Sequence, residues 1–209
     1  MNYKLSNIAS KERIKEFTRL NFRYPHLHKP RRKINGFKEQ TISIITMDAP
    51  NEITQGIWGI LPQNYTENWS KFQNIKRTLH TNKEEILQNV LFKDALLYRR
   101  CLLIVTGFYA HKIIDGEIEN YLVEKVTQEP FYLAGIYNIT NDGFTTCSVI
   151  NTKATKELND FNNLYEVMPL QIPRMFKNAW LDSSTNMKDI EFIISKPYDS
   201  KFNIQRIAS

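Results

Sequence analysis

Short apolar runs with the character of β-strands recur along this chain, and long helices do not alternate with them. The runs lie at residues 41–47, 53–61, 101–109, 120–126, 131–137, 145–150 and 191–194. A parallel sheet built from βαβ units needs a helical crossover after each strand, and this order does not supply one. We therefore expect an α+β fold: a curved, mainly antiparallel β-sheet or barrel flanked by helices.

Helical periodicity is clearest near the start of the chain. Ser10 is placed to cap a helix in which Ile14, Phe17 and Leu20 share one face. Residues 63–82 are polar and predict irregular structure. Further helices are expected at residues 84–97, 154–161 and 176–181.

The length and composition favour one globular domain over residues 1–209, because 42% of the residues are hydrophobic and 24% are charged. No apolar run approaches the length of about 20 residues that spans a bilayer. The N-terminus lacks the apolar core of a secretion signal, so we expect no membrane and a cytoplasmic location, nucleoid-associated if the protein binds DNA. Cys101 and Cys147 lie in strand-like runs and are expected to be buried, reduced thiols.

Positive charge is concentrated in HKPRRK, residues 28–33, within a chain of net charge +6. A basic balance weakly favours a polyanionic partner. Proline and charge predict that this segment is an exposed loop. The loop is either merely solvated or contacts phosphates.

Neither a metal nor a cofactor is expected. His26 and His28 have no third ligand at a useful spacing. The chain contains seven glycines, which argues against a glycine-rich phosphate loop or a dinucleotide-binding fold.

One segment raises the question of a reactive site: RRCLLIVTGFYAHK, residues 99–112. A buried strand leads into a turn at Gly107, a good place to mount a reactive side chain. The residue after the two aromatics is Ala110, which carries no reactive group. His111 cannot replace it, because successive strand residues point to opposite faces.

Several segments, taken in order, resemble the motifs of the SRAP family, the SOS-response-associated peptidases or abasic-site-processing proteins. No single motif decides the match, which rests on joint order and spacing over roughly residues 1–175. The resembling segments are IWGILP (57–62), TLHTNKEEI (78–86), RRCLLIVTGFYAHK (99–112), FYLAGIYN (131–138), and CSVINTKATKELND with YEVMPLQIP (147–160 and 165–173).

The resemblance implies an α+β barrel-like core with a positively charged groove for single-stranded DNA. It also implies a chemistry, in which a cysteine directly after the initiator methionine captures the aldehyde of an abasic site as a thiazolidine. An asparagine, a glutamate and a histidine assist that cysteine, which also cleaves the protein's own N-terminal methionine.

This sequence departs from the implied catalytic set at each of these positions. The cysteine falls on Asn2, whose carboxamide nitrogen is not a nucleophile. The asparagine falls on His80, the glutamate on Ala110 and the histidine on Tyr165. A further motif glutamate is retained as Glu84.

Two arginines of the motifs are also replaced. They fall on Asn82 and Val167. The resemblance therefore favours a divergent SRAP-type protein that binds single-stranded or abasic-site DNA without the cross-link. Candidate phosphate contacts are Lys4, Arg31, Arg32 and Lys33, and candidate groove residues are Asn35 and Trp58, although Trp58 suits core packing equally.

Two other functions remain open. The first is an enzyme that still processes abasic sites or cleaves a peptide bond, for instance through His80 and Tyr165 as an acid–base pair. The second is a scaffold for a protein partner, with DNA binding lost, suggested by the aromatic and polar tract at residues 64–69.

Overall fold

The computed structural model describes residues 3–75, 78–164, 166–195 and 201–207. The strands are β1 (Lys4–Asn7), β2 (Asn21–Phe22), β3 (Arg31–Asn35), β4 (Thr41–Thr46), β5 (Glu52–Trp58), β6 (His80–Asn82), β7 (Arg100–Val105), β8 (Gly107–Ile114), β9 (Glu117–Lys125), β10 (Phe131–Ile139), β11 (Thr145–Lys153), β12 (Val167–Pro169), β13 (Gln171–Ile172) and β14 (Phe202–Ile207). The helices are α1 (Lys11–Thr18), α2 (Trp69–Ile75), α3 (Val90–Tyr98), α4 (Lys156–Asn159), α5 (Lys177–Leu181) and α6 (Met187–Ser195), with 3₁₀ turns at Pro25–Leu27 and Arg174–Phe176.

The larger sheet closes on itself as a barrel. Strand β4 pairs with β5 and β7, β7 pairs with β10, and β10 pairs with β11, all antiparallel. The parallel pairing of β11 with β5 closes the ring, with Cys147 opposite Trp58. This confirms the expected α+β fold with a mainly antiparallel barrel.

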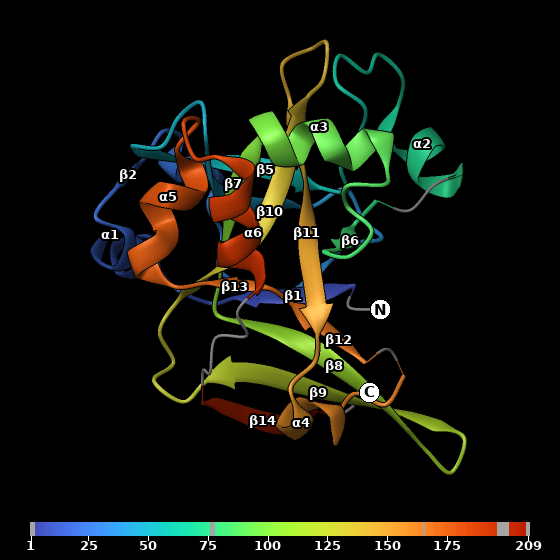
Figure 1. Ribbon diagram of the computed structural model, residues 1–209. Coiled ribbons are helices and arrows are strands. Elements are labelled where there is room, and N and C mark those ends of the chain that lie inside the picture. Colours follow the sequence, from blue (N-terminus) through green and yellow to red (C-terminus); the bar gives the residue numbers. More distant parts are fainter. Residues whose placement is uncertain (1–2, 76–77, 165, 196–200, 208–209) are drawn as a thin grey trace.

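A second, five-stranded sheet lies below the barrel in the order β14-β9-β8-β1-β3 (Figure 1). The chain passes directly from β7 in the barrel to β8 in this sheet through Thr106. The Thr106 amide donates to the Ser6 carbonyl, and the Ile8 amide donates to the Thr106 hydroxyl. The expected single strand at 101–109 is therefore two strands that bend between sheets.

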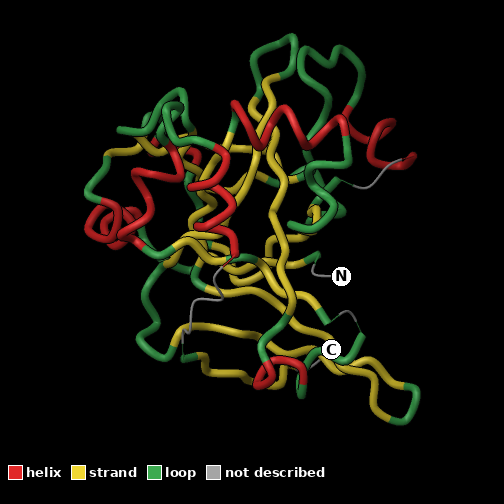
Figure 2. Tube along the Cα trace, viewed as in Figure 1, coloured by secondary structure: helices red, strands yellow, loops and turns green. Residues whose placement is uncertain are grey.

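Two apolar clusters hold this arrangement together. One fills the barrel and the space toward the second sheet, and includes Leu5, Leu103, Phe108 and Val149. The other covers the outside of the barrel beneath the helices, with Ile14 of α1, Leu96 of α3 and Trp180 of α5 among its members. In Figure 2 the longer helices surround the upper part of the molecule, while only the short α4 lies at the lower sheet.

The first helix begins at the expected N-cap but is shorter than expected, so Leu20 lies beyond its end. Its N-cap is Ser10, whose hydroxyl accepts from the Arg13 amide at 3.2 Å, and Ile14 and Phe17 are buried. The helix ends at Thr18, because Arg19 adopts a left-handed conformation. The expected helices at 154–161 and 176–181 are shorter, at α4 and α5.

Two sequence-based assignments are wrong about element type. Residues 191–194 belong to α6, not to a strand, because Asn186 caps a helix that buries Ile190 and Ile193 on one face. Residues 31–33 of the segment 28–33, expected to be an exposed loop, belong to the strand β3, although Arg32 and Lys33 are exposed. β3 pairs with β1, a segment far from it in the sequence, and this pairing is invisible to local pattern.

One further assignment has a wrong boundary, and another missed two short elements. The helix expected at 84–97 begins only at Val90, since residues 83–88 form turns and the Asn89 side chain caps the helix through the Leu91 amide. Residues 63–82, expected to be irregular, contain α2 and β6.

In the described part of the chain, no helix is both long enough and apolar enough to cross a bilayer.

Candidate nucleic-acid site

Three segments far apart in the sequence meet at one end of the barrel. β6 runs parallel to β11, with His80 opposite Val149 and Asn82 opposite Asn151, so these side chains share one face. Tyr3, just before β1, brings its ring centroid to 5.8 Å from that of His80. The candidate site is thus built from the residue before β1 and from the strands β6 and β11.

His80 is a neutral, partly unsatisfied imidazole at this site. Its Nε2 is buried and has no hydrogen-bond partner among the described residues. Burial chiefly lowers the pKa of His80, from 6.5 to about 4. At neutral pH its unsatisfied nitrogen can therefore serve as a donor or an acceptor for another group, according to the tautomer.

Asn151 is a second unsatisfied group, and sequence reasoning missed it. The side chain is 1% exposed, and neither its Nδ2 nor its Oδ1 has a partner in the described structure. An unpaired buried polar atom costs about 1–3 kcal/mol, so such a residue signals a site or an absent partner. The signal in the sequence is an asparagine within the apolar strand run at 145–153.

Ala110 and His111 lie on opposite faces of β8. Ala110 pairs with Tyr121, is 2% exposed and belongs to the inner apolar cluster, against which Tyr3 also packs. His111 pairs with Asn120 and has a buried Nδ1 without a partner in the described chain. Burial first, and then nearby Lys4, lower the pKa of His111.

A cavity of about 310 Å³ opens beside His80. Glu85 lines it, whereas the motif-derived Glu84 does not and is exposed. The lining residues are Tyr3, Leu79, His80, Thr81, Asn82, Glu85, Asn89 and Phe92. This cavity combines aromatic and aliphatic walls with neutral polar groups and one carboxylate, that of Glu85.

Basic side chains flank Tyr3 on the paired strands β1 and β3. Lys4 pairs with Asn35, and burial together with the charge of Lys33 lowers the pKa of Lys4. Arg32 and Lys33 are exposed, while Lys4 and Arg31 are half-buried. The structure thus brings the four predicted phosphate contacts onto two neighbouring strands.

Asn35 and Trp58 stabilise the backbone around this site. The Asn35 side chain accepts from the Phe37 amide at 3.0 Å and orders the turn after β3. Trp58 is 1% exposed and donates from Nε1 to the Leu79 carbonyl at 2.8 Å. Of the two roles considered for Trp58, the structure shows core packing, because a buried ring offers no face to a base.

Gly36 allows the turn after β3 to pack closely against Leu79 and Trp58. A Cβ at this position would lie 2.8 Å from a Leu79 methyl and 3.1 Å from the Trp58 ring. The Gly36 amide donates to the Tyr3 carbonyl at 2.8 Å. The glycine therefore lets the turn rest on the residues that carry β6.

Asn2 and Tyr165 lie outside the described residues, so their predicted positions in the site stay predictions. Of the two motif positions where arginine is replaced, Asn82 lines the cavity and Val167 begins β12, paired with Lys153.

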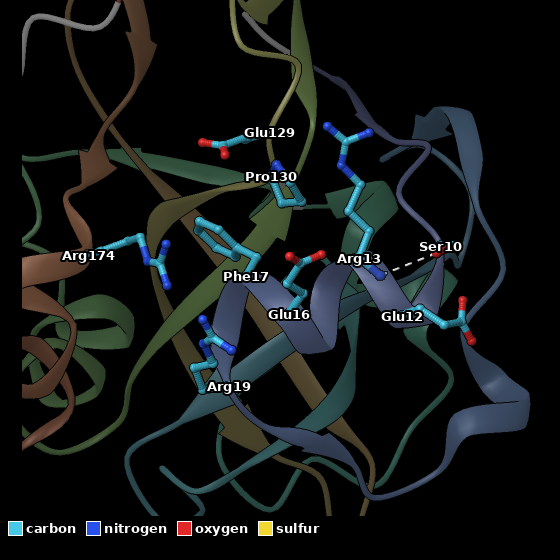
Figure 3. A pocket seen from close by; sticks show the side chains of 9 residues that line it. All are labelled: Ser10, Glu12, Arg13, Glu16, Phe17, Arg19, Glu129, Pro130 and Arg174. Atoms are coloured by element: carbon cyan, nitrogen blue, oxygen red, sulfur yellow. Dashed lines mark hydrogen bonds between the residues drawn. The ribbon is translucent and has the colours of Figure 1, made fainter.

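A larger cavity of about 580 Å³ lies elsewhere, beside α1 (Figure 3). Its charged side chains are of both signs: Arg13, Arg19 and Arg174 against Glu12, Glu16 and Glu129. The Arg174 guanidinium lies 4.9 Å from the Phe17 ring centre. None of the predicted site residues lines this cavity, so its size alone does not make it the functional site.

The architecture is that of a particular class of α+β protein. A closed barrel is joined to a second sheet through β7 and β8, and the candidate site lies at β6. The chain belongs to the SRAP family, since the model for "SOS response associated peptidase (SRAP)" matches residues 2–209. The resemblance inferred from the motifs is thereby confirmed.

Curated relatives carry related names. The abasic site processing protein YoaM of Bacillus subtilis (strain 168) is 23% identical over 168 residues, which cover 78% of this chain and 70% of that protein. The abasic site processing protein YoqW of the same strain is also 23% identical, with 78% of this chain and 71% of that protein covered.

Solved structures show the same fold. A crystal structure of a Bacteroides thetaiotaomicron protein superposes with a TM-score of 0.87 at 21% identity, covering 99% of this chain and 92% of the other. A Bordetella bronchiseptica protein superposes with a TM-score of 0.79 at 14% identity, covering 99% and 100%.

Proposed function

We propose that this protein binds single-stranded DNA, intact or carrying an abasic site, without forming the cross-link that its family motifs imply. The observation that carries the proposal is the position of the basic strands β1 and β3 directly beside the cavity at His80. A strand of DNA can then place its phosphates on the lysines and arginines while one nucleotide meets the cavity. The relatives named as abasic site processing proteins support a DNA partner.

The described residues that line the cavity offer no suitable nucleophile, which supports a non-covalent mode. The described residues that line the cavity include neither a cysteine nor a lysine. Cys101 and Cys147 are fully buried, and burial raises the pKa of both thiols, which makes them poor nucleophiles. Ala110 carries no carboxylate to assist a reaction. The sequence puts an unreactive carboxamide at position 2.

The proposal predicts salt-dependent binding. Each phosphate neutralised on a single strand contributes about −0.7 to the slope of log K against log salt concentration. Lys4, Arg31, Arg32 and Lys33 together predict a slope of about −3. Fluorescence anisotropy of a labelled single-stranded oligonucleotide, titrated at several salt concentrations, measures this slope.

The double variant Arg32→Gln/Lys33→Gln should weaken binding and make the slope less steep by about 1.4. Both side chains are exposed, so the fold should be unaffected. Lys188→Gln, on an exposed residue of α6, is the matched control and should leave the slope unchanged. A flat salt dependence, or equal effects of the two substitutions, would refute binding through β1 and β3.

A denaturing gel after incubation with abasic single-stranded DNA tests the non-covalent mode. We expect no heat-stable adduct. An adduct would show that the protein is an enzyme that uses substituted residues. Undetectable binding to every oligonucleotide would instead favour the scaffold function, with residues 64–69 as the first surface to examine.

A further inference from the structure

The cavity at His80 differs in chemistry from the basic strands next to it. It is lined by Tyr3, Leu79, His80, Thr81, Asn82, Glu85, Asn89 and Phe92. None of these residues carries a positive charge at neutral pH, because burial lowers the pKa of His80 to about 4. Glu85 adds a carboxylate. Such a lining offers a phosphate no cationic side chain and suits an uncharged group with hydrogen-bond donors and acceptors.

The size of the cavity limits what can enter. Its volume of about 310 Å³ lies at the lower end of the range of roughly 300–1,000 Å³ that is usual for small-ligand pockets. Phe92 is buried at 5% exposure, and Leu79 at 2%, so the walls include firmly packed apolar groups. One small flat group fits this description better than a length of polymer.

A row of rings leads from solvent toward the cavity. Phe37, 46% exposed in the turn after β3, lies with its ring centre 4.3 Å from that of Tyr3. Tyr3 in turn lies 5.8 Å from His80, and the planes of these two rings differ by 32°. Aromatic faces of this kind stack on nucleobases, at about 1–3 kcal/mol per base.

We propose that the cavity takes one intact, unpaired nucleobase of the bound strand, and neither a phosphate nor the ring-opened sugar of an abasic site. This inference rests on the proposed function and specifies which part of the DNA occupies the site. The phosphates on either side of that nucleotide lie on the basic residues of β1 and β3.

The polar atoms around the cavity match the edge of a base. The Asn82 side chain lines the cavity and offers both a donor and an acceptor, and the His80 ring forms part of the wall, with its Nε2 buried and without a partner in the described chain. Enzymes and binding proteins that receive an unstacked base read its edge in this way, between aromatic and apolar side chains. The sugar aldehyde, by contrast, has no amine or thiol to react with among the described lining residues.

Two oligonucleotides of equal length and equal phosphate number separate the possibilities without altering the protein. One is oligo(dA), and in the other every nucleotide is the stable abasic analogue tetrahydrofuran. We expect oligo(dA) to bind at least about fivefold more tightly at the same salt concentration, as one stacked base requires. The two salt slopes should be equal, because the phosphates are the same.

Substitutions then locate the base. His80→Leu and Asn82→Leu keep a side chain of similar size and remove its hydrogen-bonding groups. Each should weaken binding of oligo(dA) more than binding of the all-abasic oligomer, and so reduce the preference for oligo(dA). Asn141→Leu, at an exposed position in the β10–β11 turn, is the matched control and should change neither affinity.

The outcomes separate a failure of the base-binding inference from a failure of the proposed DNA-binding function. Equal affinity for both oligomers would overturn the base-binding site while leaving DNA binding intact. A preference that survives in both His80→Leu and Asn82→Leu would place the base elsewhere and overturn the assignment of this cavity. Failure to bind either oligomer would overturn the proposed function itself, together with the inference.

Discussion

His80 stands where the motif resemblance places an asparagine, and its surroundings set its behaviour. Burial makes the charged imidazolium unfavourable, so the folded protein holds the ring neutral down to about pH 4. The Nε2 of His80 has no hydrogen-bond partner among the described residues, and neither has the side chain of Asn151, which lies on the neighbouring strand β11. Such unsatisfied polar groups next to a cavity favour a binding site here, and each of them calls for a partner such as a ligand or an ordered water.

The shifted pKa of His80 predicts a dependence of stability on pH. Its folded-state pKa of about 4 lies below the ordinary value of 6.5. As pH falls below 6.5, the unfolded chain binds a proton that the folded chain does not, so the free energy of unfolding decreases until about pH 4. Urea unfolding across this range should show a smaller decrease for His80→Gln than for the wild type.

His26 provides the control for that measurement, because its side chain is exposed. His26→Gln should follow the wild-type pH profile. If His80→Gln and the wild type lose stability in parallel between pH 6.5 and about 4, then His80 is not held neutral by the fold.

At the scale of single elements, the buried Arg100 joins three segments of the outer layer. Its side chain donates to the carbonyls of Leu96 and Leu97 in α3, of Trp180 in α5 and of Asp182 just beyond it, at 2.7–3.0 Å. Burial is the main cause that lowers the pKa of Arg100 to about 10, so it remains charged at neutral pH. The guanidinium therefore satisfies carbonyl groups at the ends of both helices.

Arg100→Lys should destabilise the protein by about 3 kcal/mol, because a lysine cannot reach carbonyls on both helices and leaves at least two charged hydrogen bonds unmade. For a chain of this length, this corresponds to a fall in Tm of about 6–12 °C. Thermal unfolding followed by circular dichroism measures it.

Arg99→Lys is the matched control, since within the described structure Arg99 Nε donates to the Asn138 side chain at 2.7 Å rather than to two helices. It should cost about 1 kcal/mol or less. Similar Tm values for the two variants would mean that the hydrogen bonds from Arg100 to α3 and α5 are not important for stability.

Elements whose identity depends on distant partners were the hardest to predict. The basic segment 28–33 predicts a loop, yet its second half begins β3, because the adjoining Ile34 is buried against Leu5 of β1 and the backbone pairs there. The apolar run at 191–194 was too short to separate strand from helix, and the Asn186 cap decides for the helix. By contrast, the start of α1 is confirmed because its cap and the apolar residues Ile14 and Phe17 are local signals, whereas its end at Thr18 came earlier than expected.

At the scale of the whole molecule, barrel closure determines which side chains are inaccessible. Gly135 has no room for a Cβ, which would lie 3.0 Å from the Cys101 sulfur and 2.3 Å from a Leu103 methyl. Cys101 and Cys147 both lie within the inner apolar cluster at 0% exposure. A reagent can reach these thiols only if the barrel opens.

Thiol labelling should therefore report global unfolding. Burial raises the pKa of Cys147 to about 12 and that of Cys101 well above its ordinary value, so little thiolate exists in the folded state. With iodoacetamide and intact-mass detection, we expect no labelling of the native protein and two labels after unfolding in urea. Fast labelling of either cysteine under native conditions would show that the barrel opens locally.

The sequence by itself determined the α+β class, the family, and most of the barrel strands, because alternating and apolar runs encode local burial and the motif order encodes ancestry. It also indicated that Ala110 cannot supply an acid. Only the tertiary structure decided that Trp58 is core, that Glu85 replaces Glu84 beside the cavity, and that Asn151 shares a face with His80. Those facts depend on strand pairings between residues distant in the sequence, such as β6 with β11 and β1 with β3. Pairing between distant strands is set by packing in three dimensions, and no local pattern records it.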